Sequence, residues 1–338
     1  MDLTDRKLLN IIQSKFPLVD RPYLELGNEL GIDEGEIIDR LAGLKKKNVL
    51  RQLSAIFDTR RLGYKTTLVA MAFEPGQLNK GALRINKHPG VSHNYAREGS
   101  YFNLWFTLAV PHDHDLESTV ERMGQDTKAL SYRMMPTIRF FKIGVNFDMV
   151  KEEGASTEYY SPDGFDKKKV DTKKEDDGWK RVEEVTDFEI EAVRELQEDI
   201  ALEPRPFAAM AERLETSQQE LFDLAANFQD RGIMRRFSAV LHHRRAGFHS
   251  NAMAVWNVPP ERSIEVGNTM AQSRWVTHCY ERPTFPDWQY THFTMIHATT
   301  DATCEDVAKD ISDATGINDY MLLYSTREYK KTRVRYFV

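Results

Sequence analysis

The chain has 338 residues, of which 41% are hydrophobic and 29% charged, with a formal net charge of −6 and a pI near 6.0. This length allows two or more domains, and the acidic balance argues against a protein that mainly coats nucleic acid, although it permits a local basic pocket. No run of about eighteen apolar residues occurs, so we expect no membrane span, and two cysteines, Cys279 and Cys304, fit a cytoplasmic location.

The first predicted unit is a winged helix-turn-helix over residues 1–58. Helices are predicted, with their start or stop signals, at 4–14 (Thr4 as N-cap), 22–30 (Arg21-Pro22 at its start, Gly31 at its end) and 34–47 (Asp33 as N-cap). An apolar, strand-like stretch follows at 48–57. Three short helices with a strand pair are typical of a winged helix-turn-helix.

Residues 59–150 are predicted as a ferredoxin-like domain. The expected order is strand, helix, strand, strand, helix, strand, at about 65–73, 78–87, 91–97, 101–110, 116–127 and 130–147. Helices cover one face of such a sheet and leave the other open, so the open faces of two copies can pair. Residues 151–184, with the runs KKK and KKEDD, cannot build a core and are predicted as a linker or loose surface arm.

The second half of the chain repeats the first. Arg21-Pro22 returns as Arg205-Pro206 and the segment 60–64 returns as 244–248, both at a spacing of 184 residues, and His93-x-Tyr95-x-Arg97 returns as His278-x-Tyr280-x-Arg282 at 185. Such a register indicates a tandem duplication. We therefore predict a second winged helix-turn-helix at 185–242 and a second ferredoxin-like domain at 243–338. The result is an α+β fold with a pseudo-twofold axis and the two sheets packed face to face.

The candidate site is centred on residues 277–298. His278, Tyr280 and Arg282 alternate along a strand, so their side chains share one face. After a proline-bearing loop the chain is predicted to return through Trp288, Tyr290 and His292. Polar side chains are costly to bury without partners, so such a face is expected to meet a ligand. The simpler alternative is hydrogen bonding across a solvated sheet face.

DNA binding is not expected. The candidate recognition helices begin Glu34-Gly35-Glu36 and Gln218-Gln219-Glu220, and the carboxylates of the first would repel phosphate.

Helix-turn-helix units followed by ferredoxin-like domains resemble the Lrp/AsnC regulators. The chain is more closely similar to one branch of that superfamily, the sirohaem (also spelled siroheme) decarboxylases. The segments that carry this resemblance are RRFSAV (235–240), HRRxGF (243–248), HCYxRP (278–283) and PDWxY (286–290) in the second half, with RLGY (61–64), HNYAR (93–97) and YFNLWFTL (101–108) in the first.

The resemblance implies an enzyme that removes two acetate carboxylates of sirohaem as CO₂. The product would be didecarboxysirohaem, in haem d1 or alternative haem biosynthesis, and the only cofactor would be the iron of the substrate itself. His278, His93, Tyr280 and Arg282 are the predicted catalytic residues, because histidine is well matched to proton delivery near neutral pH. Substrate binding is assigned to Arg60, Arg61, Tyr95, Arg97, Arg235, Arg236, Arg244, Arg245, Trp288, Tyr290 and His292, since guanidinium groups grip carboxylates. No protein metal site is predicted.

The two halves are not equivalent. Gln52 and Val110 of the first half occupy the positions of Arg236 and His297 in the second, which favours one competent pocket at the junction. Alternative hypotheses are an Lrp/AsnC-type transcription regulator that senses an amino acid or haem, and a non-catalytic haem carrier. Besides the internal pseudo-dimer, further homo-oligomerisation is possible.

Overall fold

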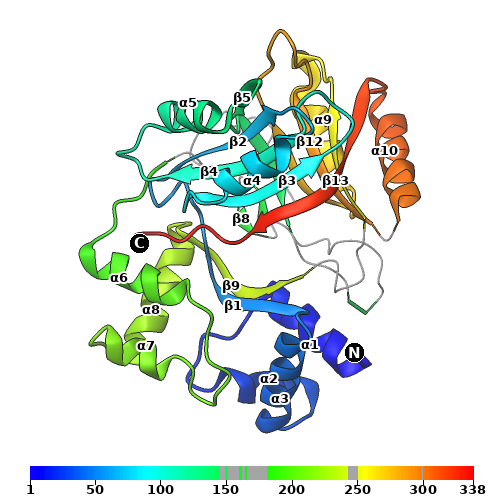
Figure 1. Cartoon of the computed structure of the whole chain (residues 1–338). Coiled ribbons are helices and arrows are strands. Elements are labelled where there is room, and N and C mark those ends of the chain that lie inside the picture. The colour runs from blue at the N-terminus through cyan, green and yellow to red at the C-terminus, as the bar shows by residue number, and fades with distance from the viewer. Residues whose placement is uncertain (145–148, 151–159, 162–163, 166–180, 243–249, 299) are drawn as a thin grey trace.

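The computed structural model describes residues 1–144, 149–150, 160–161, 164–165, 181–242, 250–298 and 300–338. The described elements form two layers, with winged helices in the lower part of Figure 1 and a large β-sheet with its helices above them. The lower layer contains α1 (Leu3–Ser14), α2 (Pro22–Leu30), α3 (Glu34–Lys46) and β1 (Leu50–Phe57) from the first half, and α6 (Asp187–Leu196), α7 (Ala208–Arg213), α8 (Gln218–Asp230) and β9 (Met234–Leu241) from the second.

Local capping signals set most of the helix starts. The side chains of Asp33, Thr186 and Ser217 each accept a hydrogen bond from the backbone N–H three residues later, and Gly31 ends α2 at a φ of 71°. The predicted cap of the first helix was wrong. Asp2, not Thr4, is the N-cap, because it forms a reciprocal capping box with the acidic Asp5.

The two winged units share one β-ribbon and one core. A strand pair was expected inside each unit, but β1 pairs antiparallel with β9 of the other half, with Ser54 opposite Ser238. Phe16 from the first half packs on Phe207 and Phe237 from the second, at ring-centroid distances of 6.5 and 5.8 Å. An isolated two-stranded ribbon is marginal in water, so helices from both halves stabilise it.

The upper layer confirms the predicted strand–helix–strand–strand–helix–strand order in both halves. The first half supplies β2 (Lys65–Ala72), α4 (Leu78–Ile85), β3 (Val91–Arg97), β4 (Leu104–Val110), α5 (Leu116–Thr127), β5 (Ser131–Met135) and β6 (Arg139–Ile143). The second supplies β10 (Ser250–Trp256), η2 (Pro260–Arg262), α9 (Ser263–Gln272), β11 (Val276–Glu281), β12 (His292–Ala298), α10 (Asp301–Thr315) and β13 (Tyr320–Lys331). Two short strands, β7 (Tyr160–Ser161) and β8 (Gly164–Phe165), extend the edge beyond β6.

Each half lends its last strand to the sheet of the other. The strand order is β5-β2-β4-β3-β13-β10-β12-β11-β6-β7-β8. The first part of β13 pairs with β10 of its own half and the second part pairs with β3 of the first half. The strand predicted over 130–147 is interrupted near Pro136, so β5 pairs with β2 and β6 pairs with β11. This exchange interlocks the halves.

Apolar side chains fill part of the space between the two sheets. The cluster includes Trp105 and Met135 from the first half and Met253, Trp288 and Phe293 from the second. The helices of each half pack on the outer faces, where separate apolar clusters form. The predicted face-to-face pairing of the sheets is therefore confirmed.

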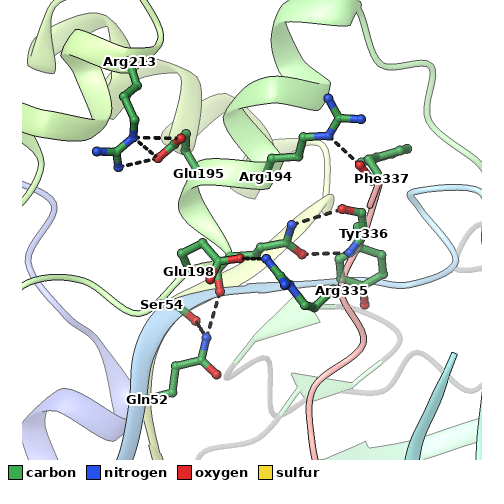
Figure 2. Close-up of polar contacts among 10 residues, drawn as sticks. Gln52, Ser54, Arg194, Glu195, Glu198, Arg213, Arg335, Tyr336 and Phe337 are labelled. Atoms are coloured by element: carbon green, nitrogen blue, oxygen red, sulfur yellow. Dashed lines mark hydrogen bonds and ion pairs between the residues drawn. The ribbon is translucent and has the colours of Figure 1, made fainter. Parts of the chain in front are cut away.

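The C-terminal segment joins the two layers. Beyond β13 it crosses to α6, where the Tyr336 N–H donates to Gln197 Oε1 at 2.8 Å and Gln197 Nε2 donates to the Tyr336 carbonyl at 3.1 Å (Figure 2). Arg335 pairs with Glu198, and Arg194 Nε donates to the Phe337 carbonyl. None of the helices in the described part of the chain has the length and apolar character that crossing a membrane requires.

Candidate active site

A cavity of about 830 Å³ lies between the sheet layer and the β1–β9 ribbon. Inward-facing residues of β3, β4, β11 and β12 form one side, the ribbon forms another, and residues 331–336 close a third. The volume is within the range of ligand sites in proteins. The winged-helix layer thus forms one wall of the cavity through its β1–β9 ribbon.

The two His-x-Tyr-x-Arg motifs meet in this cavity. His93, Tyr95 and Arg97 line it from β3, and the matching triplet lines it from β11 and the residue after that strand. The His93 and Tyr95 rings are stacked at 6.4 Å, and those of His278 and Tyr280 at 5.9 Å. The predicted common face of each strand is correct. It faces an internal cavity and not a solvated sheet surface.

Arg97 and Arg282 occupy mirrored positions behind the tyrosines. The guanidinium of Arg97 lies 5.4 Å from the Tyr95 ring centroid and donates to the Leu323 carbonyl on β13. The guanidinium of Arg282 lies 4.9 Å from the Tyr280 ring and donates to the Met135 carbonyl on β5. Burial lowers the pKa of both guanidiniums to about 10. Their Nε atoms have no hydrogen-bond partner among the described residues. Both charges are therefore buried at a cost that their surroundings offset only in part.

Both cavity histidines are held neutral. Burial, assisted by Lys331 and Arg51, lowers the pKa of His93 to about 4, and burial with nearby cationic groups lowers the pKa of His278 to about 3. Burial also raises the pKa of Tyr95 and Tyr280. In the empty cavity at neutral pH, all four rings are uncharged.

A buried carboxylate neutralises part of the positive charge on the second half's side of the cavity. Asp58 is 2% exposed and accepts from Arg235 Nη2 at 2.8 Å and from Arg60 Nη2 at 3.1 Å. Burial alone would raise the pKa of Asp58, but the two guanidiniums together hold it below its usual range. Arg235 lines the cavity with this carboxylate attached.

Sequence reasoning missed four cations that line the cavity, Arg51, Lys331, Arg333 and Arg335, of which Arg335 pairs with Glu198. Lys331 pairs in register with His93, and Arg51 donates to the Lys331 carbonyl. Arg333 donates to Ser54 Oγ and the Ala55 carbonyl, both at 2.9 Å. Two signals were available in the sequence. Arg51 is the counterpart of Arg235 at the repeat spacing of 184, and the segment KKTRVR alternates basic residues.

Several predicted substrate-binding residues lie outside the cavity wall. Arg60 is occupied by Asp58 and the Phe140 ring, and Arg61 pairs with Glu183 at 3.1 Å. Trp288 stands behind Trp105 and Phe293, which line the cavity, and Tyr290 packs against Trp288. Arg244 and Arg245 lie outside the described residues.

The prediction of which β12 side chains face the cavity was wrong. His292 is fully buried on the helix-facing side, where its Nε2 donates to the Ser263 carbonyl at 2.9 Å and its ring stacks on Phe141. The cavity face is formed instead by Phe293, Met295 and His297. Trp288 and Tyr290 lie in the loop before β12, so the alternation predicted through them does not set the phase of the strand.

In the described part of the chain, no group of three or more His, Cys, Asp or Glu side chains is placed to hold a metal ion. Cys279 packs in the core beneath α9, on the opposite face of β11 from His278.

Comparison with known proteins agrees with this geometry. Residues 61–142 and 245–330 match the family described as "AsnC-like ligand binding domain", and residues 5–51 and 189–235 match the "Siroheme decarboxylase NirDL-like HTH domain". A siroheme decarboxylase of Hydrogenobacter thermophilus is 39% identical over 98% of this chain and 94% of its own length. The chain belongs to the siroheme decarboxylase family.

Two further relatives show how the two halves of this chain correspond to subunits in the family. The siroheme decarboxylase beta subunit of Methanosarcina barkeri is 49% identical over 44% of this chain and 97% of its own length, so a separate subunit corresponds to one half here. The crystal structure of the siroheme decarboxylase NirDL in complex with an iron-uroporphyrin III analogue matches 99% of this chain and 95% of that one, with 33% identity and a TM-score of 0.72. The single chain is thus an internal pseudo-dimer.

Proposed function

We propose that this chain is a carbon–carbon lyase that removes two acetate carboxylates of sirohaem as CO₂ and releases didecarboxysirohaem, for haem d1 or alternative haem biosynthesis. The observation that carries the proposal is the pair of buried guanidiniums, Arg97 and Arg282, which line the cavity and form no ion pair with a carboxylate of the described residues. A carboxylate-rich macrocycle supplies the missing negative charge.

A second group of cations supports the same ligand. Arg51, Arg236 and Arg333 line the cavity together. Burial, with the like charges of Arg236 and Arg51, lowers the pKa of Arg333 to about 10. Like charges in such a cluster repel one another, and an anionic ligand relieves that repulsion. We assign these three residues, with Lys331, to the grip on the substrate carboxylates.

The reaction requires a proton at the carbon that loses CO₂. The bond between the acetate methylene and its carboxyl carbon breaks, the electron pair stays on the methylene carbon and delocalises toward the macrocycle, and a proton then completes the methyl group. His278 and His93 are our proton donors, and Tyr280 and Tyr95 position the reacting group. The substrate carboxylates oppose the effect of burial and raise the pKa of both imidazoles, so that binding loads them with the protons they deliver.

Arg282 and Arg97 hold each reacting acetate and keep it ionised, as loss of CO₂ requires. The iron belongs to the substrate, and the proposal assigns no further cofactor. Two buried free thiols, Cys279 and Cys304, support a cytoplasmic location.

Anaerobic incubation with sirohaem, followed by mass spectrometry of the extracted tetrapyrrole, tests the function. We expect loss of the mass of two CO₂ molecules. Retention of all the carboxylates by a folded, sirohaem-bound protein would sink the enzyme proposal and leave a carrier.

The regulator alternative predicts salt-dependent binding to duplex DNA. Around the start of α3, Glu34 pairs with Arg21 and Glu36 pairs with Arg40, so the basic side chains nearby are already occupied. We expect no measurable affinity for random duplex DNA at physiological salt. Binding with a steep salt slope would favour the regulator.

A further inference from the structure

A hydrogen-bonded chain of side chains leads to His278 along the cavity wall, which Asn251 and His297 also line. Asn251 Nδ2 lies 2.9 Å from His297 Nε2, His297 Nδ1 lies 3.0 Å from Thr277 Oγ1, and Thr277 Oγ1 lies 3.0 Å from His278 Nδ1. The links come from β10, β12 and β11. Thr277 is fully buried and His297 is 7% exposed.

The direction of the chain follows from its first member. The amide Nδ2 of Asn251 can only donate, so His297 Nε2 accepts and the hydrogen of that ring is on Nδ1. His297 then donates to Thr277 Oγ1. The Thr277 hydroxyl has two acceptors within reach, His278 Nδ1 at 3.0 Å and the Met295 carbonyl at 3.3 Å, and the shorter contact is the one to His278. His278 is left with its hydrogen on Nε2, the ring nitrogen farther from the backbone. In this orientation Asn251 Oδ1 accepts from the Ser325 hydroxyl at 3.4 Å.

The first half lacks the second imidazole. His93 Nδ1 lies 3.1 Å from Ser92 Oγ, which lies 2.7 Å from Thr107 Oγ1. Val110 occupies the position of His297 in the repeat. A hydroxyl pair can rotate to donate either way, so it does not fix the tautomer of His93.

We propose that His297, acting through Thr277, is a positioning residue that fixes the ring orientation and tautomer of His278 and makes the second half's side of the cavity the more effective proton donor. Only the expected effect of His297 on turnover rests on the proposed function. When His278 is protonated the chain still holds the ring, because the Thr277 hydroxyl both accepts and donates. Partners that orient a functional imidazole typically contribute about 10–100-fold to activity.

The test compares two replacements at residue 297. His297→Leu removes the donor, and we expect kcat to fall roughly 10–100-fold with KM little changed. His297→Asn places an amide N–H close to the position of the imidazole Nδ1, and we expect it to restore most of kcat. Equal losses in both variants, at equal thermal stability, would overturn the proposal.

A second pair of variants covers the case in which His297→Leu does not fold. Thr277→Val keeps the shape and removes the hydroxyl, whereas Thr277→Ser keeps the hydroxyl. We expect loss of kcat in the first and near-normal kcat in the second. Similar kcat in the two variants would contradict a role for the hydroxyl link.

A readout without substrate separates this inference from the proposed function. In the ¹⁵N spectrum of the full-length protein without ligand, we expect His278 to be the Nε2–H tautomer and to become a tautomer mixture in Thr277→Val. An unchanged tautomer would overturn the inference even if the wild type decarboxylates sirohaem. A wild type with the expected tautomer but no turnover would instead refute the proposed function alone.

Discussion

The two sides of the cavity descend from the same repeat but carry different surroundings. Around His93 the structure gathers Arg51 and Lys331. Around His278 the corresponding arginine, Arg235, is paired with buried Asp58, and the imidazole is hydrogen-bonded through Thr277 to His297. The His278 side therefore has a partly neutralised arginine and a more defined histidine.

This difference shows that a duplication supplies two similar scaffolds, whose side chains can then take on different roles. Burial and nearby cations lower the pKa of His278 to about 3 and that of His93 to about 4, so the two sides differ in how the imidazole is held and not in a relief of its pKa. Our proposal assigns the better-positioned proton donor to the His278 side. We therefore expect the substitutions below to affect binding and turnover differently on the two sides.

The largest effect is expected for His278→Ala. Turnover of sirohaem should fall by roughly 10²–10⁴-fold, the usual loss for a general acid, while binding persists because the arginines still hold the carboxylates. His93→Ala should have a smaller effect.

Product analysis by mass spectrometry distinguishes one site from two. Accumulation of a monodecarboxylated species in either single variant would mean that each side removes one carboxylate. It would contradict the proposal that the His278 side is the more effective proton donor. Loss of binding in His278→Ala, with normal turnover of the bound fraction, would make His278 a ligand or positioner instead.

Asp58→Asn tests the neutralised side. It leaves Arg235 and Arg60 without their buried carboxylate, so the free energy of unfolding should fall by about 3–5 kcal/mol in denaturant titrations. Bound iron-uroporphyrin III should raise the melting temperature of this variant more than that of the wild type, because its carboxylates replace the lost charge.

The matched control for Asp58→Asn is Glu195→Gln, which breaks the surface pair with Arg213 and should cost less than about 1 kcal/mol. Equal losses in the two variants would argue that Asp58 is not a critical partner.

Arg333→Gln tests the cationic side. We expect iron-uroporphyrin III to bind about 10–100-fold more weakly in absorbance titrations, the equivalent of one lost charge-assisted hydrogen bond. The control is Arg327→Gln on β13, the strand just before Arg333, since Arg327 is exposed and donates to Asn79 outside the cavity. Unchanged affinity in Arg333→Gln would remove this residue from the proposed grip.

The smallest expected effect concerns pH. His93 and His278 have folded-state pKa values of about 4 and 3, below the ordinary value of 6.5. As the pH falls below 6.5, the unfolded chain takes up protons that the folded protein excludes, so the free energy of unfolding decreases toward acid. By pH 5 the loss should be on the order of 1 kcal/mol per imidazole. The double variant His93→Asn/His278→Asn should lose less, and a pH dependence equal to that of the wild type would contradict the burial effect.

The sequence by itself determined the elements and the repeat. Helix caps such as Asp33 and Ser217 act over three residues, and strand alternation places His278, Tyr280 and Arg282 on one face. These signals are local, so they can be read without knowing the partner of each element. The spacing of 184 residues added the duplication, and with it the paired motifs of the candidate site.

Only the tertiary structure decided which distant segments meet. Pairing of β1 with β9, exchange of the last strands, and the path of the C-terminal segment brought Arg51 and Lys331 to His93 and Arg333 into the cavity wall. The phase of β12 placed His297, and not His292, in that wall. Such contacts depend on how complete sheets and cores pack between residues far apart in the chain, and no local periodicity encodes that choice.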